Sequence, residues 1–250
     1  DIYLFDFQAG DGKFGADGCR TVNGVPQCAG HMMIENDFSR SGYKNAREGL
    51  RVLISHELFH AVQSSYKSGM PGWWSEGTAT WHEELFDPSQ NDFEHLANIY
   101  FRSPERSLSD RQRGASDSFA YGASLFVYFL STVHSHTIIK EVFEEQSKGK
   151  EILEALDFVL KSKKSSLKAS FEQFSIQNIF TGTRAKEKYG YKDANRFAMI
   201  GPLKSLGKDQ QFNWNVEVAP LAARFAVIAF TRRTAFKVVS YEKYKAPALY

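Results

Sequence analysis

Apolar residues recur every three to four positions through most of the chain, which is the spacing of a buried helix face. This period predicts helices over residues 45–66, 74–86, 92–101, 118–130, 138–146, 152–160 and 167–180. The segment 118–130 is apolar on almost every side, so we expect this helix to be largely buried.

Strands are predicted towards the two ends of the chain, where the pattern changes from helical spacing to short apolar runs and alternation. They cover residues 1–7, the centre of 30–38, 212–218, 223–230 and 236–241. Residues 8–29 are polar and rich in glycine, which predicts a long loop. The separate strand and helix segments indicate an α+β fold. We expect one domain over residues 1–185 and a strand-rich region over 186–250, which could be the start of a β domain.

The composition is that of a soluble globular protein, with 42% hydrophobic and 24% charged residues among 250. The formal net charge of +2 gives no reason to expect a nucleic-acid partner. Lysines are frequent between residues 148 and 168, but interleaved apolar residues favour a solvated helix face there. No run of 18 apolar residues occurs, so we predict no membrane span, and the sequence does not indicate an oligomeric state.

The two cysteines, Cys19 and Cys28, are separated by eight residues in the glycine-rich segment. They lack the Cys-x-x-Cys spacing of a redox or zinc pair, so we predict a disulfide in an oxidising compartment. Two free thiols in a cytosolic protein are the alternative. No signal peptide is recognisable, and the sequence opens on a strand pattern, so we expect an export signal to have been removed. Both observations favour a secreted or periplasmic protein.

The predicted helix over 45–66 contains the pattern His-Glu-x-x-His at His56, Glu57 and His60. Residues four apart on a helix lie one turn above each other, so both imidazoles point the same way. Two imidazoles at this spacing can bind one zinc ion, and the glutamate between them can polarise a metal-bound water.

A second motif supplies a third ligand. Glu76 follows His60 after fifteen residues, which is enough chain to end one helix, turn and begin the next. Here the sequence resembles the gluzincin metallopeptidases, the clan of thermolysin and aminopeptidase N, and a similar pairing occurs in secreted bacterial metalloproteases of little-known function. The aminopeptidase N group often carries Trp-x-x-Glu-Gly-x-Ala on its second helix, matched here by Trp73, Glu76, Gly77 and Ala79. The two motifs cover about 35 residues.

The resemblance implies a zincin-like domain, with a small sheet, an active-site helix and a mainly helical second half. It implies a Zn²⁺ ion held by His56, His60 and Glu76, with water in the fourth position. Glu57 would take the proton of that water and return it to the leaving amine. In this clan the strand before the zinc helix is the sheet edge that binds substrate peptides.

The resemblance also implies a donor to the oxyanion of the tetrahedral intermediate. Aminopeptidase N relatives supply a tyrosine from a Tyr-x-x-Gly helix, and Tyr121 is our candidate. Here Tyr121 directly precedes Gly122, and alignment on the glycine would put Phe119 in the tyrosine's place. His134 and His136 are the alternative donors.

Two acidic residues are weighed for supporting roles. Thermolysin has an aspartate four residues after its glutamate ligand that supports a histidine; Thr80 stands there in this chain, so Glu83 is our candidate to orient a ligand. Glu35 partly matches the Gly-x-Met-Glu-Asn signature with which aminopeptidases bind the substrate's amino terminus. The alternative for Glu35 is a solvent-facing strand residue.

The sequence therefore predicts a zinc-dependent peptidase, acting as a secreted endopeptidase on peptide or protein substrates. One alternative is an aminopeptidase of the same clan, which would need Glu35. The other is a catalytically silent, peptidase-like binding or adhesion module. It is disfavoured because His56, Glu57, His60 and Glu76 are all intact.

Overall fold

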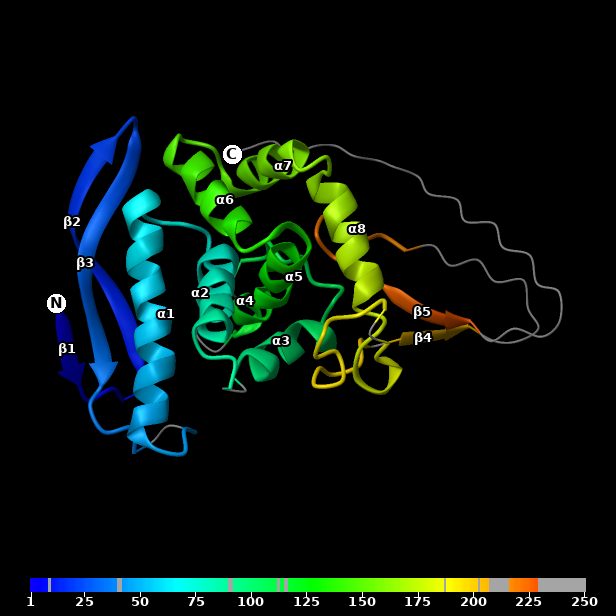
Figure 1. Cartoon of the computed structure of the whole chain (residues 1–250), viewed down its shortest axis with the longest axis horizontal. Helices are drawn as coiled ribbons and strands as arrows, with labels where there is room; N and C mark the ends of the chain where they lie inside the picture. Colours follow the sequence, from blue (N-terminus) through cyan, green and yellow to red (C-terminus); the bar gives the residue numbers. More distant parts are fainter. Residues whose placement is uncertain are drawn as a thin grey trace.

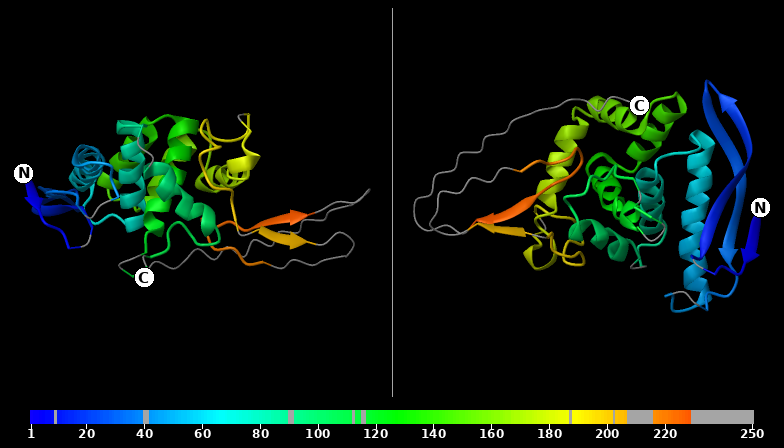
Figure 2. Two further views of the ribbon diagram at one scale, coloured as in Figure 1. Left: turned by 90° about the horizontal axis from the view of Figure 1, so that it is seen from below. Right: turned by 180° about the vertical axis from the view of Figure 1, so that it is seen from behind.

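A computed structural model of the chain has a mixed α+β fold and describes residues 1–8, 10–39, 42–89, 92–111, 113–114, 117–186, 188–201, 203–206 and 216–228. A three-stranded sheet lies at one end of the molecule, and the long helix α1 (Ala46–Tyr66) packs between this sheet and the remaining helices (Figure 1). A second, two-stranded sheet lies at the opposite end in both views of Figure 2.

The three-stranded sheet has the order β1-β3-β2. Its strands are β1 (Ile2–Phe5), β2 (Gly12–Val22) and β3 (Val25–Glu35). The predicted loop over residues 8–29 is therefore wrong, since most of it forms β2 and the first part of β3. The turn between them is Asn23-Gly24, and both residues have positive φ, 52° and 81°. This is the geometry of a two-residue hairpin, and Asn-Gly is its strongest sequence signal.

The hairpin also changes which strand forms the edge. β3 pairs in parallel with β1 and antiparallel with β2, so the strand before α1 is the central strand. The expectation that this strand is the edge is wrong. The hairpin folds β2 back alongside β3, so β2 is an edge strand of the sheet. β2 lies next to the predicted site residues of α1.

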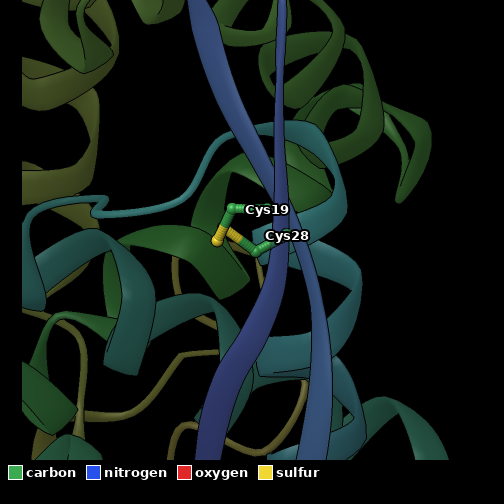
Figure 3. Close-up of a disulfide and its surroundings, with 2 residues drawn as sticks. All are labelled: Cys19 and Cys28. Atoms are coloured by element: carbon green, nitrogen blue, oxygen red, sulfur yellow. A yellow bond between two sulfur atoms is a disulfide. The ribbon is translucent and has the colours of Figure 1, made fainter.

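Cys19 and Cys28 face each other across the hairpin and form a disulfide, as predicted (Figure 3). Cys28 is buried with 4% exposure, whereas Cys19 lies on the exposed side of β2. The bond ties the edge strand to the central strand near the hairpin turn.

Helix α1 begins where the sequence predicts. The side chain of Asn45 caps it by accepting a hydrogen bond from the amide of Glu48 at 3.0 Å. Leu53 packs with Met32, Ile34 and Phe38 between α1 and the sheet. This core layer fixes α1 on the sheet, so the opposite face of the helix is directed at the helical part of the molecule.

The helical part follows the predicted order. It comprises α2 (Gly72–Phe86), α3 (Asp92–Arg102), α4 (Phe119–Gly122), α5 (Ser124–His134), α6 (Thr137–Ser147), α7 (Ile152–Ser162) and α8 (Leu167–Gln177). The apolar segment predicted as one buried helix forms two, α4 and α5, which meet at Ala123. It is buried as expected, and Gly77 of α2 packs against the backbone of Ala123 at this junction.

Beyond α8 the described chain has little regular structure apart from a short 3₁₀ helix, Gly182–Arg184, and two parallel strands, β4 (Leu203–Leu206) and β5 (Phe225–Ile228). β5 falls inside the strand predicted over 223–230. Residues 216–218 are not a strand, and the rest of that prediction, 212–215, lies outside the described residues, as does the strand predicted over 236–241. Within the described ranges, no helix is both long and apolar enough to cross a membrane.

Candidate metal centre

Helices α1 and α2 bring the three predicted ligands together. His56 and His60 lie one turn apart on the face of α1 that packs against α2, and Glu76 lies in the second turn of α2. Nε2 of His56 lies 3.0 Å from Nε2 of His60 and 3.2 Å from Oε2 of Glu76. Nε2 of His60 lies 3.5 Å from the same carboxylate oxygen.

These three atoms fit one metal ion. In a tetrahedral zinc site with bonds of about 2.0–2.1 Å, neighbouring ligand atoms are roughly 3.3 Å apart. The observed separations of 3.0, 3.2 and 3.5 Å scatter around that value. Two imidazoles and one carboxylate are also a donor set that zinc accepts, although other transition metals accept it as well.

The other nitrogen of each imidazole is held by a side chain. Nδ1 of His56 forms a short hydrogen bond with Glu83, which is the supporting contact predicted for that residue. Nδ1 of His60 lies 2.8 Å from Oε1 of Gln63. When Nδ1 carries the proton, Nε2 presents its lone pair to the metal position.

Gln63 is a site residue that the sequence reasoning missed. Its amide nitrogen donates to the backbone oxygen of Ser75 and to the hydroxyl of Thr78, both at 2.8 Å. These bonds fix which end of the amide accepts from His60. Gln63 lies three residues after His60 on α1, so helical spacing was a signal that could have identified it.

Thr80 does not take part in this network. It is fully buried and its hydroxyl has no hydrogen-bond partner among the described residues. The position four residues after Glu76 is therefore not the one that supports a ligand here. Glu83, one turn further along α2, makes that contact instead.

The carboxylates of Glu76 and Glu83 favour a positive charge at the cluster of candidate ligands. Burial opposes ionisation of Glu76, but hydrogen bonds from His56 and His60 outweigh burial and lower its pKa to about 2. Burial also opposes a charge on His56, yet Glu76 and Glu83 raise the pKa of His56 above its ordinary value. A proton or a metal ion can supply that charge.

Glu57 lies beside the ligands in a cavity of about 400 Å³. It is only 4% exposed, and its Oε2 atom has no hydrogen-bond partner among the described residues. Burial raises the pKa of its carboxyl group, whereas the nearby histidines lower it. A Cβ atom at Gly12 would lie 2.9 Å from Oε1 of Glu57, so a larger residue there would displace this carboxylate from its position beside β2.

The cavity is open along the edge strand. Gly12, Lys13, Phe14 and Ala16 of β2 form one wall, and α1 forms another. Tyr121, at the end of α4, lies on a third side. Its ring stacks on His56 with centroids 6.0 Å apart. Burial and the adjacent carboxylates raise the pKa of Tyr121, so its hydroxyl keeps its proton and can donate it in a hydrogen bond.

The other residues weighed as donors or substrate contacts lie elsewhere. His134 and His136 do not line the cavity. Glu35 is neither a cavity residue nor solvent-facing, since it is 7% exposed. Its two oxygens accept hydrogen bonds from the backbone amides of Phe7 and Asn36, at 2.9 and 2.8 Å, and so stabilise the chain at the end of β3.

Comparison of the chain with protein families, with characterised proteins and with solved structures finds no match. Similarity therefore assigns no family, and the chemistry of the site has to be argued from its own side chains.

Proposed function

We propose that this chain is a zinc-dependent peptidase with a zincin-like catalytic domain. One observation carries the proposal: His56, His60 and Glu76 converge on one point, and beside it in an open cavity the Oε2 atom of Glu57 has no hydrogen-bond partner among the described residues. A site with a purely structural metal would have no need of an open cavity or of a buried carboxylate oxygen without a partner. The resemblance to gluzincins in the same two motifs supports this conclusion.

Zinc, when bound by these three side chains, supplies a Lewis acid that polarises the scissile carbonyl group and acidifies water. Glu57 accepts the proton of the attacking water on its free Oε2 and passes it to the nitrogen of the leaving amine. The hydroxyl of Tyr121 donates a hydrogen bond to the oxyanion that forms at the former carbonyl. Glu83 and Gln63 keep the two imidazoles oriented.

The unpaired edge of β2 is a surface that can bind a peptide. One side of β2 pairs with β3, while its other side is unpaired among the described strands and borders the cavity. An extended peptide can add itself to such an edge through backbone hydrogen bonds, which are independent of side-chain sequence. This mode suits peptide or protein substrates and places a peptide bond beside the ligands and Glu57.

An endopeptidase is favoured over an aminopeptidase because Glu35 is engaged in the turn after β3 and does not line the cavity. The disulfide supports an extracytoplasmic location, since such bonds persist in oxidising compartments. A silent binding module remains the competing function. It would bind peptides at the same edge without cleaving them.

The experiment combines metal analysis with cleavage of peptides that are blocked at both ends. We expect one zinc ion per chain and internal cleavage of the blocked peptides. Glu57→Gln should retain zinc and the fold but lose roughly 10²–10⁴-fold in rate, which is the usual contribution of a general base. Full metal content in a His56→Ala, His60→Ala double variant would show that the metal lies elsewhere. Parent-like cleavage by Glu57→Gln would rule out the proposed mechanism.

Two further outcomes decide between the alternatives. Cleavage restricted to peptides with free amino termini would favour an aminopeptidase. Zinc binding without any cleavage, together with measurable peptide binding, would favour the silent module.

A further inference from the structure

A second cavity, of about 320 Å³, adjoins the metal centre. Glu76 and Tyr121 line both cavities, so the ligand cluster lies between them. The first cavity runs along β2 and α1. The second is formed by the start of α2, by residues 109–111, and by Arg106, Asp117, Phe119 and Ala120, and the mechanism above does not use it. A peptide bond held at the metal would extend side chains, or a chain end, to both sides.

The acidic residues of the second cavity are already neutralised. Asp117 accepts two hydrogen bonds from the guanidinium group of Arg106, at 3.0 and 2.9 Å, and another from the backbone amide of Arg113 at 2.7 Å. Asp110 accepts a hydrogen bond from the side chain of Arg113 at 2.8 Å. Glu76 faces the two histidine ligands.

Arg111 is the charged side chain of the second cavity that is not neutralised by a described neighbour. It lines the cavity, its side chain is exposed, and it forms no ion pair within the described part of the chain. The start of α2 adds to the positive potential, because this helix has neither a side-chain cap nor an acidic residue in its first turn. Pro71, Gly72 and Trp73, where α2 starts, line the same cavity. A negatively charged group is therefore the ligand that this cavity would attract.

We propose that the second cavity is a substrate subsite for a carboxylate group, and that Arg111 determines this specificity. The inference rests on the proposed peptidase function. The carboxylate would come from an acidic side chain next to the scissile bond or from the carboxyl terminus of the peptide. Arg106 is paired with Asp117 and forms part of the cavity wall, whereas Arg111 would bind the carboxylate of the substrate.

The test measures binding to the zinc-loaded Glu57→Gln variant, in which peptides are not turned over. Three fluorescent peptides of one sequence are compared: one with a glutamate and an amidated end, one with glutamine and an amidated end, and one with glutamine and a free carboxyl terminus. We expect one of the two carboxylate peptides to bind about three- to tenfold more tightly than the neutral one, as befits a partly exposed ion pair. Which of the two does so identifies the source of the carboxylate.

Arg111→Ala on the same background should abolish this preference, and Arg102→Ala, at an exposed arginine that does not line the cavity, is the matched control that should keep it. Equal binding of all three peptides, or a preference that survives Arg111→Ala, would overturn the proposal. Loss of the preference in both variants would also overturn it, because the effect would then come from the general positive charge of this surface. Failure of the peptidase function shows separately, as absence of cleavage by the zinc-loaded parent.

Discussion

Nδ1 of His60 lies 2.8 Å from Oε1 of Gln63, three residues further along the same helix. The carbonyl of this amide can only accept, so the contact puts the proton of a neutral His60 on Nδ1 and leaves Nε2 free for a metal. The hydroxyl of Ser75 also donates to Oε1 of Gln63, at 2.8 Å. Helix α2 thereby helps to orient a ligand of α1.

We predict that Gln63→Leu weakens zinc binding by roughly 10–100-fold, since loss of a partner that orients a ligand typically has this effect. Competition with a chelating indicator measures the affinity. Gln63→Glu keeps an acceptor for His60 and should retain more of the affinity than the leucine variant. Gln173→Leu, at an exposed position of α8, serves as the control and should bind zinc as the parent does. An unchanged affinity in Gln63→Leu would mean that the hydrogen bond does not orient His60.

Tyr121→Phe is predicted to retain zinc and the fold while lowering kcat by about 10²–10³-fold, the usual effect of removing one oxyanion donor. The ring stacks on His56 and would stay in place without the hydroxyl. KM should change little, because the donor acts on charge that develops in the transition state. Steady-state kinetics on a blocked peptide measure both constants.

Tyr128→Phe is the control for that variant. Tyr128 packs against Phe93 and Tyr191 and lines neither cavity, so kcat should stay close to that of the parent. A loss of zinc from Tyr121→Phe would instead point to a role of the phenol in holding Glu76.

The cluster of three candidate metal ligands was predictable because their spacing in the sequence is local. Helical geometry alone puts His56 above His60, and one turn between two helices brings Glu76 within reach. Glu83 could also be assigned by helical phase, because it lies two turns beyond Glu76 on the same face. Gln63 has the same kind of signal in its spacing from His60.

The hairpin was not predictable from composition, because its glycines are required by side chains that are distant in the sequence. Glycine is disfavoured in strands, and Gly12 and Gly15 made residues 8–29 resemble a loop. In the fold, a Cβ atom at either position would lie 2.9 Å from a side chain, Glu57 for Gly12 and His31 for Gly15. Those side chains come from α1 and β3, so the need for glycine exists only after folding. The Asn23-Gly24 turn was the one local signal.

The second cavity depends even more on tertiary structure. Arg106 and Asp117 are eleven residues apart in the sequence, yet the guanidinium group of Arg106 donates two hydrogen bonds to the carboxylate of Asp117. The sequence pattern places both residues between the helices predicted over 92–101 and 118–130 and does not indicate that they meet. Only their mutual contact shows that Arg111 is the arginine left to interact with a ligand.

Removal of the disulfide should lower the free energy of unfolding by about 2–3 kcal/mol, the value expected from the entropy of so short a loop. The Cys19→Ser, Cys28→Ala double variant tests this, with alanine at the buried position. Chemical denaturation of parent and variant measures the difference. Because the bond ties the edge strand to β3, we also expect a higher KM for peptides in the variant. Two titratable thiols in natively exported protein would count against both the bond and the export argument.

A pH-dependent contribution to stability is expected away from the candidate metal centre, between α2 and α3. Glu84 of α2 and Glu94 of α3 interact electrostatically, and Oε2 of each is buried without a hydrogen-bond partner among the described residues. Arg196 pairs with the other oxygen of Glu94 at 2.7 Å. Burial first, and then the charges of Glu94 and Asp193, raise the pKa of Glu84 to about 7. In the unfolded chain its pKa is about 4.5.

The sign of the pH dependence follows from these two values. Below about pH 4.5 Glu84 is protonated in both states and does not affect stability; between 4.5 and 7 only the folded state keeps the proton, so stability falls as pH rises. Glu84→Gln removes this loss. Since the group is only half buried, we expect the variant to exceed the parent by about 1–2 kcal/mol at pH 8 and to match it near pH 4.5. Urea denaturation across this range measures the difference. A constant offset between Glu84→Gln and the parent would mean that the substitution alters packing and not the ionisation of this carboxyl group.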